Sequence, residues 1–206
     1  MDISRPLQNL MGQNTARVLR RLSLVSDELT GRRIAELAEV PAMSAGRVLA
    51  DLTETGLVHA RDVGRARVYR LNRDHVLWNP LDGMLKAPAI IERDIGEIAG
   101  ESASAGVTVA VFGSFARGEA GTKSDIDIVI VSRDDAHQDR RFELVDALRE
   151  RIQRLTGNGI DVIDILDEDL ARLVRADDAL VESWLRDART VSGPDLTTRI
   201  SEVKVS

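Results

Sequence analysis

Residues 113–131 read GSFARGEAGTKSDIDIVIV, and two features of this segment indicate a fold. The first is the Gly113-Ser114 pair, which follows an apolar, β-branched run over 107–112 and precedes residues able to begin a helix. A turn between a strand and a helix presents backbone N–H groups to an anion, and glycine has no Cβ to obstruct a phosphate. We therefore predict a strand over 107–112 that ends in a phosphate-binding turn.

The second feature is a pair of aspartates, Asp125 and Asp127, at the start of another apolar run. Residues two apart in a strand point to the same face, and neighbouring carboxylates on one face repel each other. A divalent cation such as Mg²⁺, which prefers a few carboxylates completed by water and phosphate oxygens, would relieve this repulsion. Simple exposure at the solvent end of the strand would relieve it too, so the pair alone leaves both explanations open.

A third carboxylate, Asp161, follows at the start of a later apolar run, after a predicted helix over 142–155 and a Gly157-Asn158-Gly159 turn. In a strand beginning at residue 160, Asp161 shares a face with Ile163 and Ile165. Asp164 falls on the opposite face, where we expect it to face solvent or cap a helix. If the two strands are neighbours, Asp161 completes a carboxylate triad with the earlier pair.

The combined pattern is Gly113-Ser114, ten intervening residues, Asp125-Ile-Asp127, and a later Asp161 on another strand. It resembles the polymerase-beta-type nucleotidyltransferase superfamily, particularly its minimal bacterial members, over about residues 107–193. The resemblance implies a mixed sheet flanked by helices and an enzyme that uses a nucleoside triphosphate, with ATP as the expected donor. It also implies a toxin–antitoxin setting, since minimal members often modify a partner protein or RNA.

The resemblance assigns roles to individual residues. Gly113 and Ser114 would contact the β- and γ-phosphates, and Asp125 and Asp127 would bind two Mg²⁺ ions. Asp161 would bind the metal nearer the attacking hydroxyl and help to take its proton. Two metals and a positioned triphosphate suit nucleotidyl transfer on chemical grounds as well.

Arg117 follows the Gly-Ser pair and has two interpretations. It would neutralise the charge of pyrophosphate, as part of the nucleotide site, or it would pair with Glu119 or Asp125. The sequence favours neither interpretation over the other.

The N-terminal part of the chain differs in charge. Residues 1–75 carry 12 basic and 9 acidic residues, a net +3, whereas the remaining 16 basic and 25 acidic residues give −9. Helical spacing predicts helices from Asn14, over 32–39, and from Ser44 to Gly56, with Asn14 or Thr15 and then Ser44 as N-caps. Alternation over 57–71 predicts a hairpin.

These elements resemble the winged helix-turn-helix of bacterial transcriptional regulators, over about residues 15–75. In such a module the third helix enters a major groove and the hairpin meets phosphates. On the third helix we expect Ser44, Ala45, Arg47, Ala50 and Asp51 to face outward. The candidates for DNA binding are Ser44, Arg47, Arg61, Arg65, Arg67 and Arg70. The alternative is that this domain packs against its neighbour or a second copy, with its arginines merely solvated.

Composition excludes several other classes. Cysteine is absent and only three histidines occur, so disulfide frameworks, thiolate sites and histidine-built zinc sites are disfavoured. Six aromatic residues are few for a protein that stacks single-stranded bases. The absence of a long apolar run or a signal-like N-terminus predicts a cytoplasmic protein without membrane contact.

The sequence thus predicts an α+β chain with two domains. We expect a winged helix-turn-helix domain over 1–75, a linker and connecting helix over 76–106, a nucleotidyltransferase domain over 107–194 and a mobile tail over 195–206. The leading function is Mg²⁺-dependent transfer of a nucleotidyl group, AMP from ATP, to a protein, RNA or small-molecule hydroxyl. The alternative is a DNA-binding regulator whose nucleotidyltransferase-like domain senses a nucleotide or pairs subunits in a homodimer without catalysis.

Overall fold

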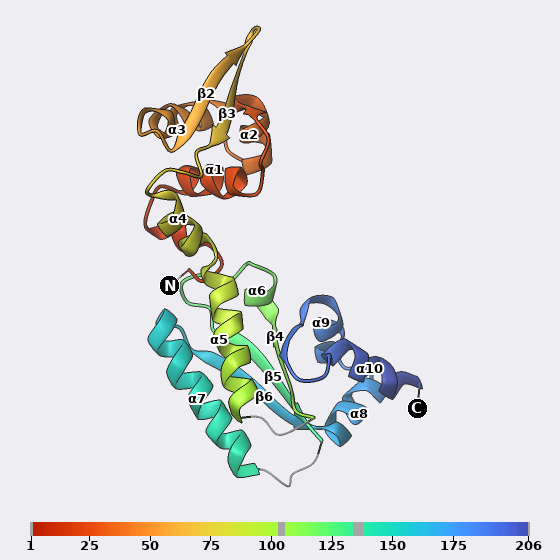
Figure 1. Ribbon diagram of the computed structural model, residues 1–206. Coiled ribbons are helices and arrows are strands. Elements are labelled where there is room, and N and C mark those ends of the chain that lie inside the picture. The colour runs from red at the N-terminus through yellow and green to blue at the C-terminus, as the bar shows by residue number, and fades with distance from the viewer. Residues whose placement is uncertain (1, 103–105, 134–137, 206) are drawn as a thin grey trace. The chain divides into compact units, whose positions relative to one another are not determined.

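The computed structural model describes residues 2–102, 106–133 and 138–205 (Figure 1). It divides the chain into two compact units, Arg5–Ala87 and a second unit made of Met1–Ser4 with Pro88–Ser206. The sequence had placed the end of the first domain at residue 75. The difference arises because the residues just after 75 form a helix that packs on the first unit.

The first unit contains short helices followed by a small antiparallel sheet. Its elements are η1 (Pro6–Asn9), α1 (Gln13–Ser23), β1 (Leu29–Thr30), α2 (Gly31–Ala38), α3 (Ala42–Glu54), β2 (Val58–Val63), β3 (Ala66–Leu71) and α4 (Trp78–Leu85). The sheet has the order β1-β3-β2, and β2 and β3 form the predicted hairpin. Three helices followed by a hairpin is the element order of a winged helix-turn-helix.

Local sequence sets the helix ends in this unit. The side chain of Thr30 accepts a hydrogen bond from the backbone N–H of Arg33 at 3.3 Å and so caps α2. Helix α3 begins at Ala42, directly after Pro41, which donates no N–H. Ser44 therefore lies inside the first turn of α3. The prediction that Ser44 is the N-cap of this helix is wrong.

The segment over 76–106, predicted as a linker and a connecting helix, contains the helices α4 and α5 (Ala87–Ser102). Trp78 of α4 is buried in the core of the first unit, and the guanidinium of Arg73 lies 5.3 Å from the centre of its ring. The next helix, α5, buries Ile91 and Ile95 in the core of the second unit. Apolar residues thus anchor α4 in the first core and α5 in the second.

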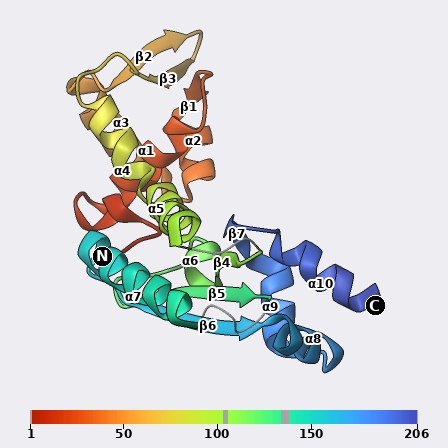
Figure 2. The same cartoon turned by 60° about the horizontal axis from the view of Figure 1, so that its bottom comes forward.

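The second unit has a four-stranded mixed sheet between two layers of helices. Besides α5 it contains β4 (Thr108–Phe112), α6 (Gly113–Ala116), β5 (Ile126–Ser132), α7 (Gln138–Thr156), β6 (Ile160–Leu166), α8 (Asp167–Arg175), α9 (Ala179–Asp187), β7 (Arg189–Ser192) and α10 (Leu196–Val205). The strand order is β6-β5-β4-β7. Strands β5 and β6 run parallel (Figure 2), whereas β4 is antiparallel to both β5 and β7. The predicted α+β fold is confirmed, and β7 lies at one edge of the sheet.

Each face of this sheet has its own core, because the strand residues alternate. Val109 and Val111 of β4 pack toward α5 and α7, whereas Ala110 and Phe112 pack toward α8, α9 and α10. Figure 1 shows these two groups of helices on opposite sides of the sheet. A side chain on β5 or β6 is thereby assigned to one helical layer by its position in the strand.

Both ends of the chain contribute to the second unit. Ile3 is fully buried in the core that contains Ile91 and Ile95. At the other end, the prediction of a mobile tail over 195–206 is wrong, because residues 196–205 form α10. Its Leu196 and Ile200 are fully buried against the sheet, and this pair at helical spacing holds the helix in place.

Candidate active site

The parallel pairing of β5 and β6 brings the predicted aspartates to one end of the sheet. Asp127 and Asp161 are direct register partners, and Asp125 lies two residues before Asp127. Their strands point these side chains to the face that α8, α9 and α10 cover, the face of Val129 and Ile163. Asp125 and Asp161 are exposed and Asp127 is half-buried. The predicted pairing of the two strands, which brings the three aspartates to the same end of the sheet, is thus present.

Asp164 lies on the opposite face of β6, as predicted, but it has a different role from the one expected. Its carboxylate accepts a hydrogen bond from Arg141 of α7 at 3.1 Å, in a contact that is largely shielded from solvent. Asp164 therefore ties α7 to the sheet.

The carboxyl group of Asp127 is affected by the charges of both other aspartates. Burial raises its pKa above the ordinary value, and the charges of Asp161 and Asp125 raise it further. The backbone N–H of Ser114 and the charge of Arg117 act in the opposite direction without cancelling the shift. The three carboxylates thus repel one another at a partly desolvated position.

Two glycines leave room for these carboxylates. A Cβ on Gly113 would lie 2.0 Å from Oδ2 of Asp127, and Gly113 also has a φ of 70°, a conformation that favours glycine. A Cβ on Gly159 would lie 2.7 Å from Oδ1 of Asp125. The need for glycine at position 113 was predicted from the Gly-Ser pair, although for a phosphate and not for Asp127. Gly159 was predicted only to form a turn.

The residues present fit a magnesium ion by their chemistry. All three side chains offer hard oxygen donors, and their mutual repulsion is the cost that a divalent cation would relieve. Within the described residues, however, no three acidic, histidine or cysteine side chains lie close enough together to hold a metal ion as they stand. Asp125, Asp127 and Asp161 would therefore have to move closer together to share one metal ion.

The Gly113-Ser114 turn differs from the prediction in one respect. Its backbone N–H groups had been expected to be free for phosphate, but both are used by carboxylates. The N–H of Ser114 donates to Asp127, and that of Gly113 donates to Oδ1 of Asp187 at 3.4 Å. The half-buried hydroxyl of Ser114 has no partner among the described residues, so it is the donor of this turn left for a ligand.

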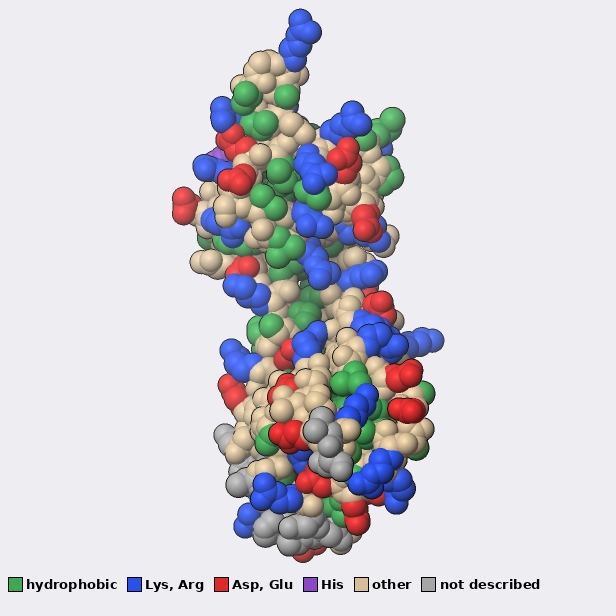
Figure 3. All heavy atoms as spheres, turned by 90° about the vertical axis from the view of Figure 1, so that its right-hand side faces the viewer, with side chains coloured by type: hydrophobic (Ala, Val, Ile, Leu, Met, Phe, Trp, Pro, Cys, Tyr) green, Lys and Arg blue, Asp and Glu red, His purple; other side chains and the backbone are tan. Residues whose placement is uncertain are grey.

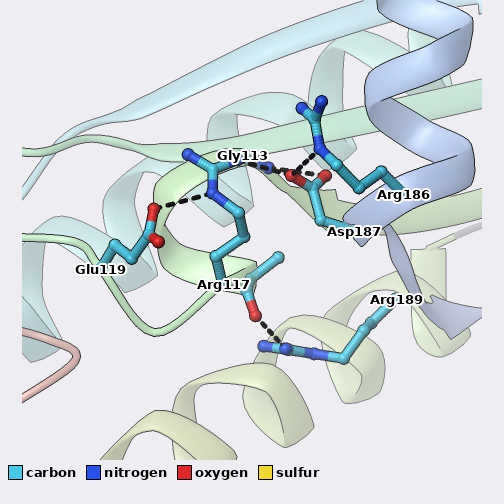
Figure 4. A network of polar contacts seen from close by, with 7 residues as sticks. Gly113, Arg117, Glu119, Arg186, Asp187 and Arg189 are labelled. Atoms are coloured by element: carbon cyan, nitrogen blue, oxygen red, sulfur yellow. Dashed lines mark hydrogen bonds and ion pairs between the residues drawn. The ribbon is translucent and has the colours of Figure 1, made fainter.

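Arg117 is exposed at the end of α6 and pairs with two carboxylates (Figure 4). Its Nε donates to Glu119 at 2.8 Å, and its Nη1 donates to Asp187 at 2.5 Å. Of the two predicted pairings, the one with Glu119 is thus present. Asp187 was missed because it lies 70 residues away and belongs to no motif.

The residues predicted to bind DNA lie in the first unit and differ from one another in exposure to solvent. On α3, Arg47 is exposed, Ser44 is half-buried, and Ala45, which had been expected to face outward, is fully buried. Ala45 and Leu49 are four residues apart and therefore share the core face of the helix. The third helix thus offers less outward surface than the sequence predicted.

The hairpin arginines are all exposed, but they do not share one face. Arg61 and Arg70 project from one side, whereas Arg67 projects from the other and Arg65 lies in the turn between the strands. Arg61 is engaged by Glu28, with a 2.7 Å bond from its Nε. On the face drawn in Figure 3, basic and acidic side chains are interspersed over this unit. DNA binding by these residues stays a prediction.

Comparisons with known proteins bear on the family of the second unit. Residues 93–189 match the family model described as a nucleotidyltransferase domain. No curated protein matches the chain. Two solved structures show weak likeness, each at 17% identity. One, described as a toxin–antitoxin with AMP-PNP, has a TM-score of 0.39 and aligns over 55% of this chain and 84% of its own.

The other is TrmBL2, described as an archaeal chromatin protein with a novel mode of DNA binding. It has a TM-score of 0.32, over 89% of this chain and 76% of its own. At these scores neither likeness bears on function. The family match defines the class of this part of the chain: residues 93–189, which lie within the second unit and include most of its mixed sheet, form a nucleotidyltransferase domain. Within the described residues, no helix has the length and apolar character needed to cross a membrane.

Proposed function

We propose that the second unit transfers a nucleotidyl group from ATP to an acceptor hydroxyl, with Mg²⁺ held by Asp125, Asp127 and Asp161. The observation that carries this proposal is the register pairing of Asp127 with Asp161 on the sheet face beside the Gly113 turn. Bound Mg²⁺ would supply positive charge to the triphosphate and to the departing pyrophosphate.

In the proposed reaction the acceptor oxygen attacks the α-phosphorus and forms a new phosphoester bond. The bond from the α-phosphorus to the oxygen that bridges to the β-phosphate breaks, and pyrophosphate leaves with its electron pair. The acceptor proton passes to a carboxylate oxygen of Asp161, which is exposed and therefore accessible to an incoming hydroxyl. The Ser114 hydroxyl and Arg117 would orient the phosphates.

The experiment that tests this proposal follows label from two forms of ATP. The full chain is incubated with Mg²⁺, cell lysate and ATP labelled at the α- or the γ-phosphate. Nucleotidyl transfer places only the α-label on an acceptor, whereas phosphoryl transfer would place only the γ-label. Transfer of the γ-label, or of neither label, would contradict the proposal.

A matched pair of variants then tests the site. Asp161→Asn removes a proposed metal ligand and proton acceptor, whereas Asp164→Asn changes the same residue type three positions along β6 on the other face. We expect loss of α-label transfer only in Asp161→Asn. The acceptor class is then identified by whether label enters protein, RNA or small molecules, with a toxin–antitoxin partner as the expected setting.

A second proposed function belongs to the first unit, where the exposed hairpin arginines favour binding to double-stranded DNA. We expect Arg65→Ala and Arg67→Ala each to reduce the slope of log affinity against log salt by about 1, because each removes one phosphate contact. Arg154→Ala, an exposed arginine on α7, is the control. If Arg65→Ala and Arg67→Ala bind DNA with the same affinity and salt slope as Arg154→Ala, the alternative is supported, in which this domain packs against its neighbour or a second copy and its arginines are only solvated.

A further inference from the structure

Asp187, the last residue of α9, contacts the Gly113-Ser114 turn, although it lies outside the sequence motif that predicted this turn (Figure 4). Its Oδ1 accepts the N–H of Gly113 at 3.4 Å, and its Oδ2 accepts Nη1 of Arg117 at 2.5 Å. Its side chain is only 5% exposed. A nearly buried carboxylate therefore joins α9 to both the turn and the arginine that follows it.

The backbone around Asp187 is held firmly in the core. Trp184, one helical turn earlier, is fully buried and packs edge-on against Phe112, with ring centres 6.2 Å apart. Phe112 is the last residue of β4 and immediately precedes Gly113. The same aromatic contact thus fixes both α9 and the strand that leads into the turn.

This anchoring decides between two roles for Asp187. An incoming phosphate could displace the carboxylate from Gly113 and Arg117, or the carboxylate could stay and hold them. Displacement would take a nearly buried charge away from the two donors that satisfy it, which is unfavourable. Because the side chain is only 5% exposed and already bonded to both donors, the holding role is favoured.

Arg117 keeps donors for a ligand while it is held. Glu119 takes its Nε and Asp187 takes its Nη1, whereas Nη2 has no acceptor among the described residues. Glu119 is 60% exposed, so solvent screens that contact more than the buried one with Asp187. Asp187 is thus the stronger constraint on where the guanidinium points.

We infer that Asp187 is a positioning residue for the nucleotide site, which holds Arg117 and the Gly113 turn in the orientation that receives the triphosphate. The inference rests on the proposed function. It adds a residue outside the motif, whose charge acts through Arg117 and not by contact with the nucleotide.

A double-mutant cycle on the full chain tests this role, with ATP and Mg²⁺ as the probe. Asp187→Asn keeps a carbonyl oxygen for the N–H of Gly113 but removes the charge that holds Arg117. We expect it to weaken ATP binding about tenfold, as the loss of a charged hydrogen bond would. KM for ATP rises accordingly, with a smaller change in kcat.

The second side of the cycle is Arg117→Gln. In that background we expect Asp187→Asn to change ATP affinity less than about twofold, because the residue it acts through is gone. A tenfold loss in both backgrounds would overturn the inference, as would unchanged affinity in Asp187→Asn alone. If Asp187→Asn does not fold, the comparison of Arg117→Gln with the double variant decides, since the double variant has no unpaired buried charge.

Arg186→Gln is the matched control. Arg186 is 65% exposed and its Nε lies 3.7 Å from the same Oδ2 of Asp187, so it touches the carboxylate without joining it to the turn. We expect its ATP affinity to equal that of the wild type. If the wild type neither binds ATP with Mg²⁺ nor transfers the α-label, the proposed function fails together with this inference. Normal wild-type activity with an unaffected Asp187→Asn overturns the positioning role alone.

Discussion

Asp127 lies directly opposite Asp161 across the parallel strands β5 and β6, on the side of the sheet that carries α9. Like charges that face each other across two strands destabilise the fold. Partial burial adds a further cost, because it removes water from the charged carboxylate. The raised pKa of Asp127 records both effects. The protein therefore keeps a destabilising arrangement at the place where its proposed chemistry needs negative charge.

Asp127→Asn should stabilise the fold at neutral pH while it abolishes transfer. Because the pKa of Asp127 is raised in the folded state, its ionisation costs stability above that pKa, and the cost disappears below the ordinary pKa. The variant should thus melt at a higher temperature than the wild type at pH 7, with a smaller difference near pH 4. Activity should fall about 100-fold or more, because metal-based stabilisation of the transition state amounts to several kcal/mol.

The measurement is thermal unfolding at several pH values beside the α-label assay. Asp146→Asn, on the exposed surface of α7, is the control, since its carboxylate is 78% exposed. A melting temperature for Asp127→Asn at or below that of the wild type at pH 7 would show that Asp127 does not carry this electrostatic cost.

Magnesium should stabilise the wild type through the same carboxylates. A ligand that binds only the folded state stabilises it by about 2.7 kcal/mol at 100 times its Kd. We expect the melting temperature to rise with Mg²⁺ in the wild type and to stay constant in Asp127→Asn. Sodium chloride at matched ionic strength separates specific binding from charge screening. An equal rise in both proteins would place the ion elsewhere.

Much of this site could be predicted because its parts are close in sequence or set by strand periodicity. Asp125 and Asp127 share a face by their spacing, and Asp161 shares the face of Ile163 for the same reason. The apolar runs predicted the strands, whereas the mixed sheet was expected only from the resemblance to polymerase-beta-type nucleotidyltransferases. Local pattern was sufficient wherever a residue's direction depended only on its own strand.

Contacts that depend on tertiary packing could not be predicted. Asp187 reaches Arg117 only because α9 packs on the sheet beside β4, and no spacing rule gives that placement. The burial of Ile3 and the order of α10 likewise depend on a core that exists only after the sheet has formed. Tertiary packing overrides local tendencies at such positions.

Gly159→Ala should reduce activity with little effect on stability. The new Cβ would lie 2.7 Å from Oδ1 of Asp125, the end of a side chain that can move away. A displaced Asp125 no longer completes the carboxylate group, and a misplacement near 1 Å can cost on the order of 100-fold in rate. The α-label assay measures this loss.

Gly157→Ala is the matched control in the same turn. Gly157 has a φ of 73° and no atom within 4 Å of an added Cβ, so alanine there would be strained without touching an aspartate. We expect the reverse pattern, a stability loss of about 1–2 kcal/mol with normal activity. The same loss of activity in both variants would mean that the shape of the turn matters and the space beside Asp125 does not.

Ile3→Ala should destabilise the second unit, although residue 3 lies before the first unit in sequence. Ile3 is fully buried with Ile91 and Ile95, and replacing such a side chain with alanine typically costs about 2–5 kcal/mol. Hydrogen exchange of the full chain should therefore show faster exchange of amides in β4 and β5. Ile34→Ala, equally buried in the first unit, should instead affect amides of α2 and α3. Unchanged protection of β4 and β5 in Ile3→Ala would show that Ile3 does not contribute to the stability of the second unit.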